Sequence, residues 1–224
     1  MVHLHSSRRG ARHRLRGHPR RPGARHAGGD RRGRRPGAPP TGGGGRHRRC
    51  RVRLHLVRHG LSAVDRSVPA HAWELDPAGY DAVWALRESG RIPDGAAWFT
   101  SPEPKAVQTA QLLTDAEVAV VEGLREHRRE STTWHDDFPD VVRRAFDDPA
   151  RPAAPGWEPL ARCRERVTTA VTGILAAHTD VPVVLVGHGT AWTVLVAELS
   201  GEPPDLARWE SLAMPDLLSV EPLR

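Results

Sequence analysis

Two histidines follow strand-like runs of the sequence, and the neighbour of one of them suits the binding of an anion. His59 comes after Arg58 at the end of the run 52–57, and His188 follows the apolar run 183–186. In open α/β sheets, ligands bind outside the carboxyl ends of the strands. An imidazole can attack phosphorus and leave again, and a guanidinium is a good planar donor to phosphate oxygens. The two segments therefore predict one site, with a nucleophile and cations for an anion.

Two further charged residues are placed to join this site. Lys105 is the only lysine of the chain and lies about one turn into a predicted helix, where a cation gains nothing from the helix dipole. An ammonium there can pair with a phosphate, although an ordinary surface lysine is the alternative. Glu126 follows a predicted strand, and a carboxylic acid at that edge can protonate a leaving oxygen and later accept a proton from water. Taken alone, Glu126 is equally well explained as an exposed glutamate.

Strand-like and helix-like patterns alternate along the body of the chain, which is typical of a mostly parallel sheet covered on both faces. Apolar runs predict strands at 52–57, 96–100, 117–121, 182–187 and 216–221. Helical spacing of apolar residues, with cap and proline signals, predicts helices over 77–89, 102–114, 159–178, 190–200 and 204–211, and a short one near 139–147. The predicted fold class is therefore α/β, a three-layer α/β/α arrangement with a mostly parallel central sheet.

One long stretch of the body has no regular pattern. Residues 127–158 are irregular and rich in Asp, Pro and Trp, so this stretch is predicted to form a lid over the site. Within it, Trp134, His135 and Trp157 are candidates to line the pocket, although filling of the core or the surface explains such residues equally well.

The first 51 residues differ chemically from the rest. They hold 16 Arg and a single acid, Asp30, so their net charge is +15 and the remaining residues carry 6 − 15 = −9. Large aliphatic residues are scarce there, so residues 1–51 are predicted to be a disordered Arg/Gly/Pro-rich tail. It could be an arginine-rich arm for nucleic acid or an acidic membrane, or the product of a start codon assigned too early. Nucleic acid is not expected as a partner, and this tail is the one segment that could bind it. Residues 52–224 are predicted to form one domain.

Cysteine usage and hydropathy argue against other classes of protein. Cys50 and Cys163 are the only cysteines, too few for a disulfide framework or a cysteine-based zinc site. No run of about 18 apolar residues occurs, so no membrane span is predicted. A cytoplasmic protein is the default expectation, and the oligomeric state is left open.

Four ordered motifs resemble those of the histidine phosphatase superfamily, also called the phosphoglycerate mutase-like family. The motifs are Arg58-His59-Gly60, Ser101-Pro102 through Thr109-Ala110, Leu124-Arg125-Glu126, and Val186-Gly187-His188-Gly189. Weaker landmarks of the same family resemble Trp157-Glu158-Pro159-Leu160, Arg166-Val167 and Met214-Pro215-Asp216. The resemblance spans about 52–221, and four motifs in order form a far more specific signal than the first alone.

The resemblance implies a phosphoglycerate mutase-like fold and a metal-independent phosphomonoesterase that hydrolyses a small phosphorylated metabolite. It implies that His59 is the nucleophile that becomes phosphohistidine, and that Glu126 donates a proton to the leaving group. Arg58, Lys105 and His188 would form the phosphate pocket. No metal and no other cofactor is expected. Two alternatives stay open, namely phosphoglycerate mutase-type phosphoryl transfer and a catalytically weak member that acts as a binding or regulatory module.

The chain departs from the family pattern at three places. Lys105 stands where the family usually has arginine, which keeps the charge but loses the two-pronged donor. Leu61 and Ser62 stand where members often have Glu-Thr, and Ser62 can still donate a hydrogen bond to a phosphate. Asp65 replaces an amide, and its charge is unfavourable near a phosphate unless the side chain points away or is paired.

Overall fold

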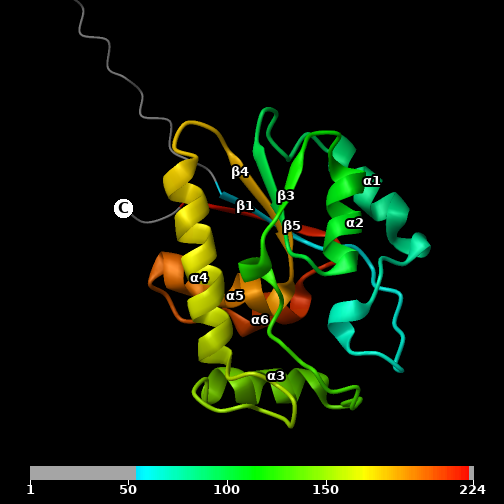
Figure 1. Ribbon diagram of the computed structural model, residues 1–224, viewed down its shortest axis with the longest axis vertical. Coiled ribbons are helices and arrows are strands. Elements are labelled where there is room, and N and C mark those ends of the chain that lie inside the picture. The colour runs from blue at the N-terminus through cyan, green and yellow to red at the C-terminus, as the bar shows by residue number, and fades with distance from the viewer. Residues whose placement is uncertain (1–53, 222–224) are drawn as a thin grey trace, which may run out of the picture. The chain divides into compact units, whose positions relative to one another are not determined.

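A central sheet of five strands organises the protein. The computed structural model describes residues 54–221, and the predicted tail lies outside them. The strands are β1 (Leu54–Arg58), β2 (Ala97–Thr100), β3 (Val118–Val120), β4 (Val183–Gly187) and β5 (Asp216–Val220). Their order is β3-β2-β4-β1-β5, in which β5 runs antiparallel to β1 and every other pairing is parallel. The prediction of an α/β fold with a mostly parallel sheet is confirmed (Figure 1).

The helices lie close to their predicted positions. They are α1 (Tyr80–Glu88), α2 (Pro104–Leu113), α3 (Phe138–Asp147), α4 (Leu160–Ala177), α5 (Gly189–Ser200) and α6 (Leu206–Ser211). Three short 3₁₀ turns are η1 (Ala70–Ala72), η2 (Pro77–Gly79) and η3 (Glu122–Leu124). Of these turns, η2 forms the start of the helix predicted over 77–89, whereas η1 and η3 carry no sequence signal strong enough to predict them. Within residues 54–221, no helix combines the length and apolar character that a membrane crossing requires.

Side chains alternate across the sheet and build a core on each face. Leu54 and Leu56 of β1 pack with residues of α4 and α5, whereas Val57 packs with residues of α1 and α2. Strand β4 alternates in the same way, with Leu185 in the first core and Val184 in the second. Figure 1 shows α1 and α2 on one side of the sheet and α4 on the other. The sheet is therefore the middle of three layers, as its apolar strands require.

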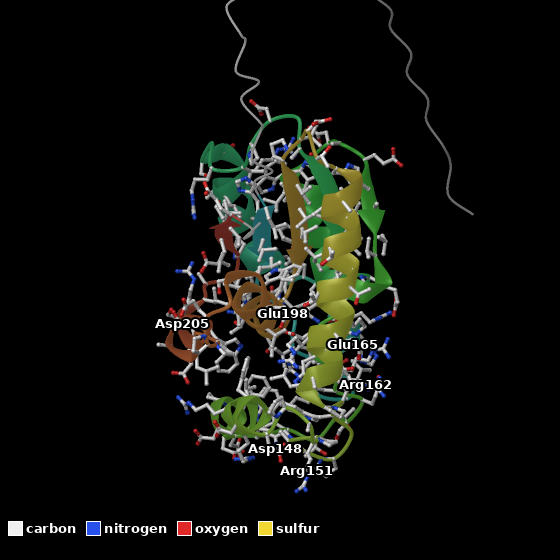
Figure 2. The ribbon with its side chains drawn as sticks, turned by 90° about the vertical axis from the view of Figure 1, so that its left-hand side faces the viewer. Asp148, Arg151, Arg162, Glu165, Glu198 and Asp205 are labelled. Atoms are coloured by element: carbon white, nitrogen blue, oxygen red, sulfur yellow. The ribbon has the colours of Figure 1, made fainter. Side chains whose placement is uncertain are left out.

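Charged side chains cover the outer surface, away from the sheet. Arg162 and Glu165 of α4 are largely exposed and form an ion pair with an N–O distance of 3.7 Å. Arg151 and Asp148 form a similar exposed pair at 3.8 Å, and Figure 2 shows these residues at the periphery of the molecule. Exposed pairs of this kind contribute about 0–1 kcal/mol, so the fold does not depend on them.

The start of α2 differs from the prediction for a local reason. Glu103 precedes Pro104 and has an extended backbone, with φ −71° and ψ 133°. The ring of a proline disfavours the helical region for the residue before it. The helix therefore begins at Pro104 rather than at 102, which leaves Glu103 in the connection between β2 and α2.

The carboxyl ends of three neighbouring strands meet at one edge of the sheet. Arg58 at the end of β1 is in register with Gly187 of β4, and Thr100 of β2 is in register with Val186. The next residues along these strands are His59, His188 and Ser101. The sheet register thus brings together three side chains from segments far apart in the sequence.

Gly187 is expected to tolerate no larger side chain. A Cβ atom there would lie 2.5 Å from Cζ2 of Trp192, whose ring is fully buried and fixed by an indole N–H bond to the Val57 carbonyl at 2.9 Å. We expect Gly187→Ala to lower the free energy of unfolding by about 1–3 kcal/mol. Gly173 of α4 is the control, because nothing lies within 4 Å of its Cβ position and alanine there should add about 0.5–1 kcal/mol. Urea unfolding measures both, and equal midpoints would contradict the prediction.

Candidate active site

The geometry of His59 leaves one ring nitrogen available for attack. Its side chain is buried, and its backbone N–H donates to the Gly187 carbonyl at 2.8 Å. Nδ1 lies 2.7 Å from the Gly60 carbonyl, and since a carbonyl only accepts, Nδ1 must carry the hydrogen. Burial, with the nearby charges of the site, lowers the pKa of His59 well below its usual value. The ring is therefore neutral, with its lone pair on Nε2.

The loop after His59 is clamped against α2. The N–H of Gly60 donates to Thr109 Oγ1 at 3.0 Å, and that hydroxyl donates to the Lys105 carbonyl at 2.6 Å. A Cβ at Gly60 would lie 2.8 Å from side-chain atoms of Leu75 and Val83. Glycine is needed here because the loop packs so closely, and the clamp fixes the imidazole in place.

Arg58 presents a buried donor that no described residue satisfies. One of its terminal nitrogens, Nη1, donates to the Leu212 carbonyl, which fixes the guanidinium. Its Nε is buried and has no hydrogen-bond partner within residues 54–221. Burial lowers the pKa of Arg58 from its usual value, yet a guanidinium remains a cation. An unpartnered buried N–H on a cation is costly, so it indicates a place for an anionic ligand.

His188 presents a second unpartnered buried nitrogen. The Glu103 N–H donates to Ser101 Oγ at 3.3 Å, and the same hydroxyl oxygen lies 2.8 Å from His188 Nε2. The other ring nitrogen, Nδ1, is buried and has no partner among the described residues. Burial lowers the pKa of His188 well below its usual value, so the ring is neutral. The ring centroids of His188 and His59 are 5.2 Å apart.

Lys105 is buried and paired with a carboxylate that the sequence analysis did not single out. Its ammonium donates to Glu103 Oε2 at 2.7 Å and to the Ala70 carbonyl at 2.6 Å. The two side chains are only 6% and 3% exposed. Glu103 also accepts the Glu126 N–H at 2.9 Å and has an oxygen 3.6 Å from His188 Nε2. The alternative of an ordinary surface lysine is thereby excluded.

Glu126 lies at the N-terminal end of α5. Its carboxylate accepts the backbone N–H groups of Thr190 at 3.2 Å, of Ala191 at 2.9 Å and of His127 at 2.8 Å. Burial alone would raise the pKa of Glu126, but the Arg129 guanidinium and the His127 N–H outweigh it, so the pKa is lowered. The carboxylate is therefore ionised in the free protein, and it is not the freely exposed glutamate that the sequence left open.

Arg166 of α4 braces the segment that carries Glu126. Its guanidinium donates to the carbonyls of Gly123 at 3.2 Å, Arg125 at 2.9 Å and Glu126 at 3.2 Å. It also pairs with Glu158 at 2.6 Å. Arg166 belongs to one of the weaker family landmarks in the sequence, but its contacts are not predictable there, because an arginine on an amphipathic helix is usually solvated.

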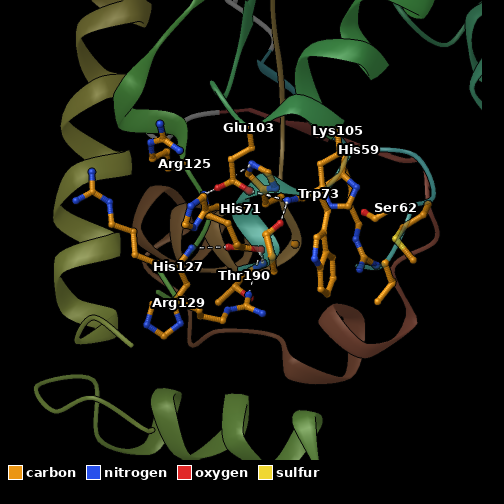
Figure 3. A pocket seen from close by; sticks show the side chains of 18 of the residues that line it. His59, Ser62, His71, Trp73, Glu103, Lys105, Arg125, His127, Arg129 and Thr190 are labelled. Carbon is orange, nitrogen blue, oxygen red and sulfur yellow. Dashed lines mark hydrogen bonds and ion pairs between the residues drawn. The ribbon is translucent and has the colours of Figure 1, made fainter. Parts of the chain in front are cut away.

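One cavity of about 500 Å³ collects the candidate residues. All the site residues predicted from the sequence line this cavity, and so does Glu103. The predicted residues are Arg58, His59, Ser62, Lys105, Glu126 and His188. Figure 3 shows His59, Lys105 and Ser62 on one side of this cavity, with Arg125 and Arg129 across from them.

The predicted lid contributes only in part. Residues 127–130 and Phe138 line the cavity, whereas Trp134, His135 and Trp157 line a neighbouring cavity of about 270 Å³ instead. The guess that these three line the site was wrong, because Trp157 is buried in a small core beside α3 and packs edge-on against the His135 ring.

Asp65 does not disturb the site. Its carboxylate accepts the backbone N–H of Ser67 at 2.8 Å and the Ser67 hydroxyl at 2.6 Å, and these two bonds lower its pKa. Asp65 is absent from the cavity lining. These two hydrogen bonds, within an exposed turn, satisfy the negative charge of Asp65, which the sequence indicated to be unfavourable near a phosphate.

The α/β fold with its mostly parallel five-stranded sheet matches phosphoglycerate mutase-like structures. The chain belongs to the histidine phosphatase superfamily (branch 1), whose family model matches residues 54–223. The resemblance noted in the sequence is thereby confirmed.

Solved structures of phosphatases are similar to this chain. The native structure of mycobacterial glucosyl-3-phosphoglycerate phosphatase has a TM-score of 0.61 and 23% identity, over 75% of this chain and 89% of that chain. Its complex with inorganic phosphate has a TM-score of 0.56 and 26% identity, over 72% and 84%. A phosphoserine phosphatase mutant from Entamoeba histolytica, in complex with phosphoserine, has a TM-score of 0.59 and 17% identity, over 75% and 89%. A search of curated proteins found no match.

Proposed function

We propose that this protein is a metal-independent phosphomonoesterase that works through a phosphohistidine on His59, within a domain of residues 52–224. The observation that carries the proposal is the state of His59, whose Nδ1–H is held by the Gly60 carbonyl so that Nε2 keeps its lone pair. Two unpartnered buried nitrogens, Arg58 Nε and His188 Nδ1, belong to residues that line the same cavity. A nucleophile beside an unfilled guanidinium donor suits an incoming phosphoryl group.

In the first step, His59 Nε2 attacks phosphorus and the P–O bond to the leaving group breaks. Arg58, Lys105, His188 and Ser62 would hold the phosphoryl oxygens, and the developing charge is stabilised by these fixed donors. The leaving oxygen takes a proton from Glu126. The ionised carboxylate of the free protein acquires this proton when the substrate binds, because a nearby phosphoryl dianion disfavours a second negative charge.

In the second step, Glu126 accepts a proton from water as that water attacks the phosphohistidine. The P–N bond breaks, inorganic phosphate forms and His59 recovers its lone pair on Nε2. As phosphate leaves, Glu126 releases to solvent one proton, equal to the one that it took up when the substrate bound, and becomes a carboxylate again. The sum of the two steps is one ester and one water converted to one alcohol and one phosphate, with each group returned to its starting state.

The substrate is proposed to be a small phosphorylated metabolite. A cavity of about 500 Å³ matches the size of site that takes such molecules. Similar structures include phosphatases named for glucosyl-3-phosphoglycerate and phosphoserine, which supports this class without naming the substrate of this chain.

Hydrolysis of an aryl phosphate by the full-length protein tests the proposal. We expect turnover that is unchanged by excess EDTA. Rapid quenching should also trap a phosphoprotein that is labile in acid and stable in base, as a phosphoramidate is. Loss of activity in EDTA with recovery on adding a metal, or an acid-stable phosphoprotein, would refute the mechanism.

A further inference from the structure

A buried carboxylate stands among the groups that would hold phosphate. Glu103 lines the same cavity as His59, and its side chain is 3% exposed. One oxygen accepts from the Lys105 ammonium at 2.7 Å, and the other accepts the Glu126 N–H at 2.9 Å. A carboxylate is an unfavourable neighbour for a phosphate, since both are negative. Its burial at this position therefore calls for an explanation.

The first consequence of this contact is the fixed position of Lys105. An ammonium has three hydrogens, and two of them are donated to Glu103 and to the Ala70 carbonyl. One donor remains for a ligand oxygen. A lysine side chain is otherwise flexible, so these two bonds replace the planar rigidity that an arginine would bring to the same position.

The second consequence is a lower positive charge in the cavity. His59 and His188 are neutral. The charged side chains that line the cavity are five lysine or arginine cations and four carboxylates, namely Arg58, Lys105, Arg125, Arg128 and Arg129 with Glu103, Glu122, Glu126 and Glu130. These charges sum to 5 − 4 = +1, and without Glu103 they would sum to +2, so a phosphate dianion would bind more tightly.

We propose that Glu103 is a positioning residue, which fixes the Lys105 ammonium and at the same time weakens the binding of phosphate so that the product leaves the site. The proposal rests on the proposed phosphatase function. A phosphatase must release inorganic phosphate at every turnover, and phosphate resembles the transferred group closely. A pocket with uncompensated positive charge would hold the product and slow this release.

Glu103→Gln removes the charge with almost no change in shape. The amide oxygen of glutamine can still accept the Glu126 N–H, whereas its NH₂ group repels the Lys105 ammonium and leaves that ammonium for the ligand. We expect the dissociation constant of inorganic phosphate, measured by calorimetry, to fall roughly tenfold. The KM for an aryl phosphate should fall in parallel while kcat does not rise, because the interaction gained is present in the ground state.

Two variants separate charge from packing. Glu103→Asp keeps the charge and shortens the side chain, so its phosphate affinity should stay within about threefold of the wild type. Glu165→Gln makes the same change in net charge on the exposed face of α4, where the side chain is 70% exposed, and should leave phosphate affinity unchanged (Figure 2). If Glu103→Gln does not fold, Glu103→Met removes the same charge and carries the same expectation.

A folded Glu103→Gln or Glu103→Met protein that binds phosphate no more tightly than the wild type would overturn the inference. An equal gain in affinity in Glu103→Asp would overturn it as well, since packing rather than charge would then be the cause. Calorimetry needs no turnover. Absence of hydrolysis in the wild type would therefore count against the proposed function, while phosphate binding would still decide the role of Glu103.

Discussion

Replacing His59 with alanine is expected to abolish phosphatase turnover, by at least about a thousandfold in kcat. The attacking lone pair on Nε2 is lost, and His188, whose ring centroid is 5.2 Å from that of His59, has its own Nε2 in a hydrogen bond with Ser101. Binding should survive, since Arg58, Lys105 and His188 keep their donors. We therefore expect loss of kcat for an aryl phosphate together with a dissociation constant for inorganic phosphate that stays within about tenfold of the wild type.

His55→Ala is the matched control for this variant. His55 lies on the same strand, is also buried, and pairs with Ser219 at 3.0 Å rather than lining the cavity. Its loss should lower stability without lowering turnover per folded molecule. Residual turnover of His59→Ala within tenfold of the wild type would mean that another group attacks phosphorus, and the proposed mechanism would fail.

The arrangement of the sheet and the gathering of the predicted site residues could be read from the sequence. Short apolar runs alternate with segments whose apolar residues have helical spacing, and this pattern predicts a parallel sheet. The carboxyl ends of parallel strands lie at one edge of such a sheet. His59 and His188 were therefore predicted to lie together, although 129 positions (188 − 59) separate them. Backbone topology alone carries this information, which is why it was predictable.

Glu103 and Arg166 could not be predicted in the same way. Their roles depend on where long side chains fold back in three dimensions, and neither belongs to a periodic pattern. Glu103 faces the site because Pro104 holds it out of the helix. The prediction that the three aromatic lid residues line the site is wrong for a related reason. The sequence of an irregular segment does not determine which way its rings point. Trp157 packs against the small core beside α3.

Glu126→Gln is expected to have the second largest effect, and the size should depend on the leaving group. An alkyl alkoxide needs a proton as it departs, so kcat/KM for an alkyl phosphate should fall by about 10²–10³. An aryl oxide with electron-withdrawing substituents leaves without that help, and the loss should be about tenfold or less. Equal losses for both substrates would show that the residue does not act as the acid. Calorimetry with inorganic phosphate and a thermal melt check that the variant keeps its pocket.

The pH dependence of kcat/KM gives an independent test of the proposed role of Glu126. The pKa of Glu126 is lowered in the free protein, so its protonated form is already scarce above about pH 5 and becomes scarcer as the pH rises. Since the acid form is the one that works, kcat/KM for an alkyl phosphate should fall with rising pH, by up to about tenfold per unit. A phosphate ester also titrates near pH 6, and that contribution remains in Glu126→Gln. The difference between the two profiles therefore isolates the carboxyl group, and identical profiles would mean that the leaving group receives its proton from elsewhere.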